Sequence, residues 1–201
     1  MVLGEVLLAV YPSANYKLEE YLEKHGMEVL GTRLSDFFHC GFIRGREETS
    51  RYFEHKPFLV GLLNTVGDGM FERARTMTEK VMASYVRHRP RISAHGLYDV
   101  VKPHIERIHL DGEGWLIPGE ILHAAGHGIH SFIVVQPFGC MPNHIFGRGV
   151  NKLAKDMYPH IQILSLDFDP DTSMANIENR LQMLIMNARE LDKLDVVANM
   201  L

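Results

Sequence analysis

The stretch SFIVVQPFGCMPNH (residues 131–144) decides the expected fold of this chain. Its first six residues, 131–136, form an apolar run, which is typical of a strand buried on both faces of a sheet. Glycine and proline then end the run, and the sequence KLAKDMYPH (152–160) beyond it has helical spacing. A buried strand that leads through a turn into a helix indicates a parallel α/β sheet.

Three other apolar runs have the same character, at residues 4–11 (GEVLLAVY), 27–31 (MEVLG) and 161–168 (IQILSLDF). A helix over residues 18–26 separates the first two runs, so residues 4–31 are expected to form a β-α-β unit. We therefore predict an α/β fold with a parallel four-stranded sheet and helices on both faces. Because right-handed crossovers through helices connect parallel strands, the four strands are expected to be parallel neighbours. The expected strand order is 2-1-3-4, numbered along the chain.

The middle of the chain has a different pattern. Residues 45–110 show helical spacing with little strand character, which predicts a helical insertion between the second and third strands. A long amphipathic helix over residues 175–194 is expected to close the fold. We predict that residues 1–201 form a single α/β domain with this insertion, as a module or fragment of a larger protein.

The composition narrows the class of protein. The 201 residues are 46% hydrophobic and 23% charged, with a formal net charge of −4, which gives no support to nucleic-acid or membrane-surface binding. No apolar run approaches the roughly 18 residues of a membrane span, and the first residues lack the pattern of a signal peptide. Two cysteines are too few for a secreted disulfide scaffold. We expect a cytoplasmic protein that binds neither nucleic acid nor membranes.

Cys140 lies just beyond the predicted strand 131–136, at the edge where open α/β sheets bind ligands. A helix N-terminus at this point favours the thiolate, which is the form that ligates metals or acts as a nucleophile. The competing interpretation is a buried structural thiol, but the flanking glycine and prolines favour a shaped loop. Cys140 is therefore a functional candidate, although iron–sulfur clusters use about four thiolates. Cys40 is interpreted as structural.

The segment LDFDPD (166–171) also stands at a strand end. Its alternating Asp167, Asp169 and Asp171 are of a type that binds Mg²⁺. We favour the simpler interpretation of a polar turn whose aspartate caps the last helix.

Two further segments are candidates for anion or metal binding. DGEGW (111–115), which contains Glu113, has the pattern of a glycine-flanked helix start whose N–H groups could meet an anion. The chain contains neither GxGxxG spacing there nor a P-loop motif, so ATP binding by those routes is unsupported. His123 and His127 share one helical face, as metal ligands do, but without an evident third ligand we favour an ordinary helix end.

Several of these segments resemble one protein family. GEVLLAVYPSAN and LEEYLEKHGMEV resemble the start of the carboxyl-terminal domain of the 2-hydroxyacyl-CoA (2-hydroxyglutaryl-CoA) dehydratase family. GEGWLIPGEI, VVQPFGCMPNHIFGRGVNKLAK, LDFDPDTS and NIENR resemble still more closely the large acyl-CoA dehydratase activase-related proteins. The matches cover residues 4–36 and 111–186, and the helical middle matches only in character.

The resemblance implies a Rossmann-like domain in which Cys140 corresponds to a ligand of a [4Fe–4S] cluster. In this family the other cysteines lie mostly in a preceding domain. An ATP-driven activator transfers one electron to the cluster, which reduces the substrate thioester so that a 2-hydroxyl leaves as water. The 201 residues include neither that cysteine-bearing domain nor the ATPase domain. We therefore expect other domains or chains to complete the cluster, and we do not expect this chain alone to be a complete enzyme.

The function predicted from the sequence is thus a module that contributes to an iron–sulfur cluster or acyl-CoA site. Its expected partners are other domains or subunits of the dehydratase and activase system, with acyl-CoA as a candidate ligand and a homodimer as a candidate assembly. The residues expected in the substrate or ligand loops are Glu113, Gln136, Asn143, His144, Asp167 and Asp169. The alternatives are a stand-alone Rossmann-like module that binds a small anion or nucleotide without metal, and a purely structural subunit.

Overall fold

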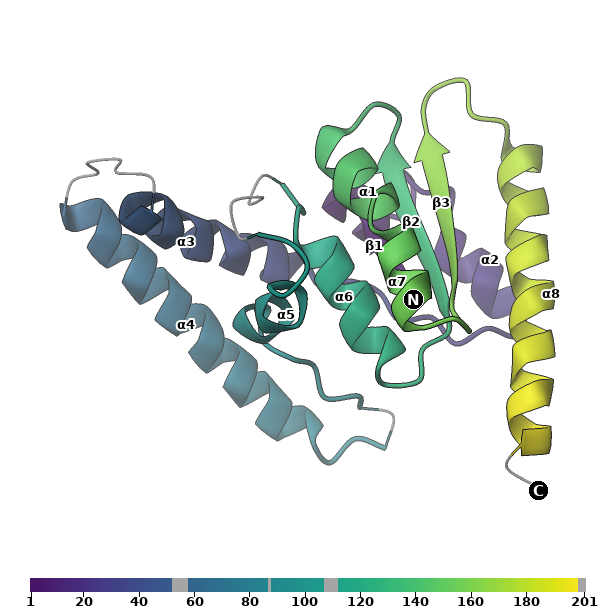
Figure 1. The fold of residues 1–201 in the computed structure, drawn as a ribbon, viewed down its shortest axis with the longest axis horizontal. Helices are drawn as coiled ribbons and strands as arrows, with labels where there is room; N and C mark the ends of the chain where they lie inside the picture. The colour runs from purple at the N-terminus through teal and green to yellow at the C-terminus, as the bar shows by residue number, and fades with distance from the viewer. Residues whose placement is uncertain (52–57, 87, 107–111, 199–201) are drawn as a thin grey trace. The chain divides into compact units, whose positions relative to one another are not determined.

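The chain divides into two compact units in the computed structural model, which describes residues 1–51, 58–86, 88–106 and 112–198 (Figure 1). Met1–Thr32 and Asp111–Leu201 form the first, which contains the sheet and is called the α/β unit below. Arg33–Leu110 form the second, whose described elements are helices, and it is called the helical unit.

In the described part of the α/β unit, helices separate the strands along the chain. In chain order they are β1 (Val2–Gly4), α1 (Val6–Val10), α2 (Leu18–Lys24), α6 (Leu116–Ala125), β2 (Ser131–Pro137), the π-helix η1 (Asn143–Arg148), α7 (Asn151–Met157), β3 (Gln162–Phe168) and α8 (Met174–Ala198). The helices predicted at 18–26, 152–160 and 175–194 are confirmed as α2, α7 and α8, with shifts of a few residues at their ends.

The sheet is open and parallel, with the order β1-β2-β3. β2 is the central strand, because Ile133 lies opposite Val2 on one side and opposite Leu164 on the other. The prediction of an α/β fold with parallel strands at 131–136 and 161–168 is confirmed. The prediction of a four-stranded sheet is wrong, because the described residues form three strands.

The strand predicted at residues 4–11 was placed wrongly. β1 ends at Gly4, whose φ of 125° is rare for other residues, and α1 begins two residues later. The Glu5 carboxylate caps α1 by accepting a hydrogen bond from the Leu8 N–H at 2.7 Å. Val6 and Ala9 are buried while Leu7 is exposed, so this apolar run has helical and not strand periodicity.

The strand predicted at residues 27–31 is absent. Gly31 forms one isolated parallel bridge with Val2 at the free edge of β1. The Val2 N–H donates to the Leu30 carbonyl at 2.8 Å, and the Thr32 N–H donates to the Val2 carbonyl at 3.1 Å. The segment therefore lies at the edge of β1 where the predicted strand was expected. β1 has only three residues, so it offers too few backbone groups for a hydrogen-bonded ladder longer than this bridge.

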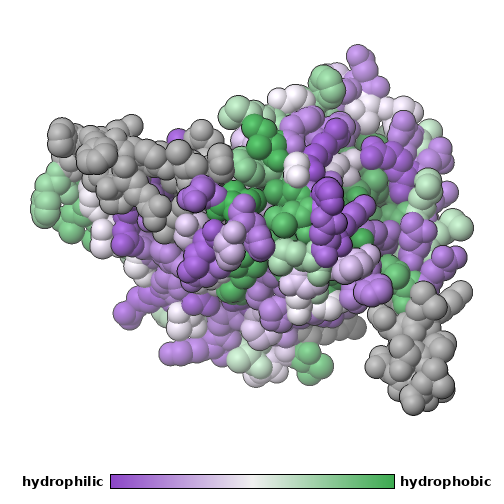
Figure 2. Space-filling model, viewed as in Figure 1, coloured by the Kyte–Doolittle hydropathy of each residue, from purple (hydrophilic) through white to green (hydrophobic). Residues whose placement is uncertain are grey.

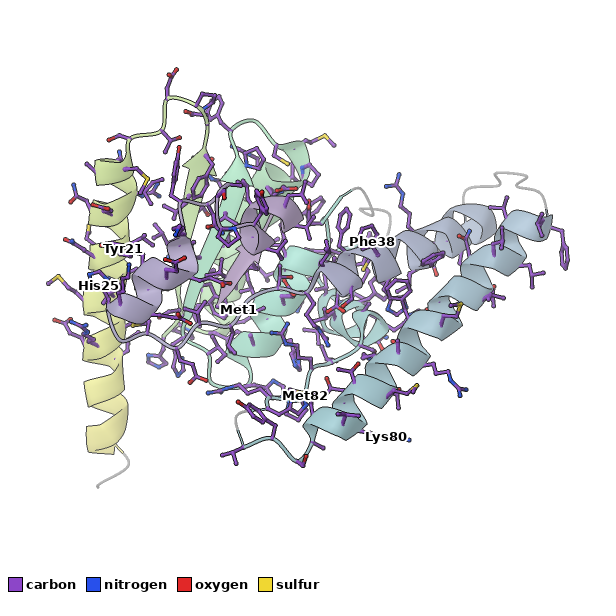
Figure 3. The ribbon with its side chains drawn as sticks, turned by 180° about the vertical axis from the view of Figure 1, so that it is seen from behind. Met1, Tyr21, His25, Phe38, Lys80 and Met82 are labelled. Atoms are coloured by element: carbon purple, nitrogen blue, oxygen red, sulfur yellow. The ribbon has the colours of Figure 1, made fainter. Side chains whose placement is uncertain are left out.

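Helices cover both faces of the sheet. On one face, α1, α2 and α8 contribute to a continuous apolar core with strand residues that include Ile133, Val135 and Leu166. On the opposite face, Gly147 of η1 lies against the Val134 side chain and near Ile117 of α6. Figure 1 shows α6 and α7 in front of the sheet with α1 and α2 behind it, and Figure 3 shows the reverse.

The contact between α2 and α8 closes the first face. Tyr21 of α2 and His25, which follows the last residue of α2, lie beside α8 (Figure 3), with their ring centroids 4.4 Å apart. Arg189 of α8 donates a hydrogen bond to the His25 carbonyl at 2.6 Å. Because Gly26 has a φ of 79°, the chain can turn immediately after α2, which is the expected role of a glycine at a helix end.

The helical unit consists, in its described residues, of α3 (Leu34–Arg51), α4 (Phe58–Met82) and α5 (Ala94–Val101). It begins at Arg33, earlier than the predicted residue 45. α4 exposes apolar side chains at a helical spacing, and Figure 2 shows hydrophobic surface at the left, where α4 begins in Figure 1. The most exposed of them near this end are Phe58, Leu59, Leu63 and Met70.

We expect the Gly4→Ala substitution to destabilise the α/β unit by about 3 kcal/mol or more, because a Cβ would overlap with the Val135 backbone in addition to straining φ. Gly26→Ala is the matched control: it has a positive φ but no atom within 4 Å of the added Cβ, so strain alone should cost about 1–2 kcal/mol. Urea unfolding of both variants measures the difference. Equal losses would show that the β1–β2 approach is not the constraint.

Candidate functional site at the carboxyl edge of the sheet

The loop after β2 carries Cys140 to the carboxyl edge of the sheet. Gly139, with a φ of 80°, allows the tight turn in which the Cys140 N–H donates to the Pro137 carbonyl at 3.1 Å. The Phe138 N–H donates to the Phe168 carbonyl at 3.2 Å, which joins this loop to the end of β3. Parallel strands end at the same edge, so side chains that follow β1, β2 and β3 meet here.

A buried hydrogen-bonded chain joins Glu113, Asn143 and Cys140. The Asn143 amide nitrogen lies 3.2 Å from the Cys140 Sγ and 3.4 Å from the Glu113 Oε2. The other Glu113 oxygen accepts a hydrogen bond from the Val6 N–H at 3.1 Å, so the carboxylate also holds the first turn of α1. Asn143 is 0% exposed and Glu113 is 7% exposed. The structure thus brings together three of the candidate residues that the sequence analysis names.

The environment of Glu113 disfavours its ionised form. Burial raises the pKa of this carboxyl above its ordinary value, and the nearby negative charge of Glu5 adds to the increase. Hydrogen bonds from the Val6 N–H and the Asn143 amide oppose the increase without cancelling it. A carboxyl with a raised pKa among polar groups in a loop cluster is typical of functional sites.

A second polar group adjoins the first. The Gln136 amide donates to Asp167 Oδ1 at 2.7 Å, and Arg148 forms an ion pair with the other Asp167 oxygen. His144 Nδ1 lies 2.9 Å from the Cys140 carbonyl, and its Nε2 lies 3.8 Å from Asp167 Oδ1. We call these residues the carboxyl-edge cluster; its members are Glu113, Gln136, Cys140, Asn143, His144, Arg148 and Asp167. Arg148 is the member that the sequence analysis missed.

Three buried polar atoms of this cluster have no hydrogen-bond partner among the described residues. They are the Gln136 Oε1, the Asn143 Oδ1 and the Arg148 Nε. Buried polar atoms are nearly always paired, so such a concentration requires an explanation such as a bound ligand or water. The π-helix η1 that carries Asn143 and Arg148 is also a rare element, and it occurs frequently at functional sites.

Asp169 lies outside this cluster. Its Oδ1 accepts a hydrogen bond from the Asp171 N–H at 2.8 Å, and its own N–H donates to the Thr172 hydroxyl at 2.9 Å. These contacts form a polar turn before α8. Asp169 therefore serves local turn geometry in this structure, and Asp167 is the aspartate that the strand end directs into the cluster.

The number of cysteines limits how many ligands this edge can give to an iron–sulfur cluster. The sequence holds two cysteines, of which Cys140 is partly buried at this edge and Cys40 is buried within α3 of the helical unit. The α/β unit therefore offers one thiol, whereas a [4Fe–4S] cluster uses about four. The residues present fit one ligand position and do not complete a cluster.

The two histidines near the end of α6 contact each other. His123 and His127 have ring centroids 4.2 Å apart, and the His127 Nδ1 lies 2.8 Å from the His123 carbonyl. Burial, followed by the charge of His127, lowers the pKa of His123. In the described part of the chain, no group of three metal-type ligands includes this pair.

A group that sequence reasoning missed lies in the helical unit. His39, Asp68 and His95 come from α3, α4 and α5, and their ligand-type atoms all lie within 4.8 Å of one another. Burial alone would raise the pKa of Asp68, but hydrogen bonds from both histidines, the charge of His95 and a hydrogen bond from Arg46 lower it. The separations of 29 and 27 residues along the chain match no short metal-binding motif, so no sequence signal was present.

Comparisons with known proteins identify no family for the chain: no protein-family model, no curated protein and no solved structure matches it. Among the residues that the structure describes, no helix combines the length and apolar character needed to cross a membrane.

We expect the elevated pKa of Glu113 to make stability depend on pH. The folded state keeps this proton at pH values where the unfolded chain has lost it, so stability should fall as pH rises from about 4.5 through the raised pKa. If the pKa of Glu113 is one higher in the folded state than in the unfolded chain, the free energy of unfolding falls by about 1.4 kcal/mol across this pH range. Urea unfolding between pH 4.5 and 8 should show that Glu113→Gln removes this part of the slope.

Glu23→Gln, at an exposed position on α2, is the control for loss of a negative charge. It should leave the pH dependence close to that of the wild type. If Glu113→Gln and Glu23→Gln give the same pH profile, the buried carboxylate does not titrate as its environment requires.

Proposed function

We propose that the α/β unit is a Rossmann-like module of the 2-hydroxyacyl-CoA dehydratase and dehydratase activase-related family. In this proposal it supplies Cys140 as one ligand of a [4Fe–4S] cluster that other domains or chains complete. The observation that carries the proposal is the contact between the buried Asn143 amide and the Cys140 sulfur, 3.2 Å apart at the carboxyl edge. The parallel sheet with helices on both faces and the FGCMPNH segment support the family assignment.

The geometry around Cys140 suits a metal-bound sulfur. An N–H donor stabilises negative charge on sulfur, and hydrogen bonds to cluster sulfurs are among the determinants of their reduction potentials. Glu113 accepts from the same amide, so the carboxylate fixes the orientation in which nitrogen, and not oxygen, faces the sulfur. Such outer partners commonly hold metal ligands in place.

The other members of the cluster are proposed to receive the substrate. The unpartnered Gln136 and Arg148 atoms could bind polar groups of an acyl-CoA. A bound cluster would supply single electrons to the thioester, whereas the residues of this chain orient the sulfur and the ligand. With one thiol at this edge, the chain by itself is not proposed to be a complete enzyme. Its two free cysteines suit a reducing compartment such as the cytoplasm.

A second candidate function is supported by the same unpartnered atoms. The Gln136 oxygen and the Arg148 Nε could hold a small anion or nucleotide without any metal. The ion pair between Arg148 and Asp167 weakens this alternative, because it neutralises the positive charge that an anion would use. We therefore place the metal-ligand proposal first.

The test is to purify the tagged chain from its native cells under anaerobic conditions, with its bound partners. We expect iron and acid-labile sulfide in the wild-type complex, and a large loss of both with Cys140→Ser, because a hydroxyl is a poor match for iron. The recombinant chain alone should be free of iron, with a Cys140 that iodoacetamide alkylates.

Cys40→Ser is the matched control, since it removes the other thiol, which is buried within α3. It should leave the iron content of the complex unchanged. Iron-free wild-type complex, or full iron content with Cys140→Ser, would contradict the proposal. In that case, stabilisation of the metal-free chain by CoA or ADP, and its loss with Gln136→Leu, would support the anion-binding alternative.

A further inference from the structure

We propose that His39, Asp68 and His95 form a binding site for one divalent transition-metal ion in the helical unit, with Zn²⁺ as the best match. The site is separate from Cys140 and does not depend on the function proposed for the α/β unit. It would join the three described helices of its unit, because α3, α4 and α5 contribute one ligand each.

The ligand atoms already converge on one point. The Nε2 atoms of His39 and His95 lie 2.7 and 2.8 Å from the same oxygen, the Oδ1 of Asp68. Ligands at about 2.0–2.1 Å in a tetrahedron around zinc are about 3.3 Å apart, so each histidine nitrogen needs to move away from the Asp68 oxygen by only about half an ångström. Two imidazoles and a carboxylate are a donor set that zinc prefers.

The surroundings prepare each ligand for metal binding. Arg46 forms an ion pair with the second oxygen of Asp68, which leaves Oδ1 directed at the two histidines. The His39 ring stacks on Phe71, with centroids 5.4 Å apart and an interplanar angle of 11°. His39 and Asp68 are 3% and 6% exposed, so these two ligands are held rigidly inside the unit.

Glu72 supplies an independent observation that favours a metal. Its Oε1 is buried without a hydrogen-bond partner among the described residues, and it lies 4.0 Å from the Nδ1 of His39. A histidine that binds metal through Nε2 carries its proton on Nδ1, where a carboxylate typically accepts it. Metal binding at His39 would therefore provide the hydrogen bond that this buried oxygen lacks.

The competing explanation is a metal-free ion-pair network in which both histidines donate protons to Asp68. That network satisfies the Asp68 oxygen, but a histidine with its only proton on Nε2 leaves Glu72 Oε1 without a donor in the described part of the unit. The His95 side chain is 38% exposed, so a metal could enter from its side and keep a fourth, solvent-facing position for water.

The experiment is a titration of the full chain, first stripped of metal with a chelator, with Zn²⁺ and with Co²⁺. We expect one Zn²⁺ per chain, a rise in the melting temperature, and the visible absorption of four-coordinate Co²⁺. His95→Gln and Asp68→Asn each remove one ligand and should weaken binding by more than about 100-fold. Glu72→Gln, which removes only an outer partner, should weaken it by about 10- to 100-fold.

Three control variants test the location. His88→Gln breaks a similar pair in the same unit, where His88 Nε2 lies 2.7 Å from Glu79, and should leave zinc affinity unchanged. His127→Gln and Cys140→Ser should also bind zinc normally, which separates this site from the α6 histidine pair and from the proposed cluster ligand. Because His95 is partly exposed, its variant should fold even if Asp68→Asn does not.

Absence of stoichiometric zinc binding by the stripped wild-type chain would overturn the proposal. So would wild-type zinc affinity in His95→Gln. If Cys140→Ser loses zinc binding while His95→Gln retains it, the zinc binds at the Cys140 thiol and not at the helical unit.

Discussion

The parallel pairing of β2 with both of its neighbours is the constraint on which the α/β unit depends. Because β1, β2 and β3 run in the same direction, their carboxyl ends open onto one edge of the sheet. The residues that follow these strands are thereby collected from distant parts of the chain: Val6, Cys140 and the strand-end Asp167. The close approach of Gly4 to the Val135 backbone makes this pairing intolerant of a side chain.

Glu113 converts that shared edge into a defined arrangement. Its buried carboxylate accepts hydrogen bonds from the Val6 N–H and the Asn143 amide, so one side chain joins the start of α1, the loop before α6 and the π-helix. Burying a carboxylate is costly unless donors compensate it. The charge of Glu113 therefore sets the orientation of the Asn143 amide. The ionised carboxylate accepts from the amide nitrogen, which also donates to Cys140. A protonated carboxyl could instead donate to Asn143 Oδ1, and the amide could then turn its oxygen toward Glu113.

Sequence patterns predicted the two longer strands and failed where tertiary contacts decide. The run at 131–136 forms the central strand, whose interior residues are buried, and the run at 161–168 forms a partly buried edge strand of the same apolar character. The run at 4–11 has the same composition, but Gly4, the Glu5 cap and the contact between Val6 and Glu113 make most of it a helix. The positions of Cys140 and Asp167 at the carboxyl edge followed from the predicted strand ends, whereas the pairing of Arg148 with Asp167 depends on a π-helix that no pattern indicated.

The two side-chain groups differ in chemistry as well as in origin. The carboxyl-edge cluster presents one soft thiol and several unpartnered polar atoms, so it needs atoms from outside the described chain to satisfy it. The group in the helical unit presents two imidazoles and a carboxylate that already converge, so a single ion could complete it. Soft thiolates suit iron–sulfur clusters, while imidazole with carboxylate suits zinc. A metal ion in the helical unit would therefore be held by this chain alone, whereas a cluster at Cys140 would need ligands from a partner.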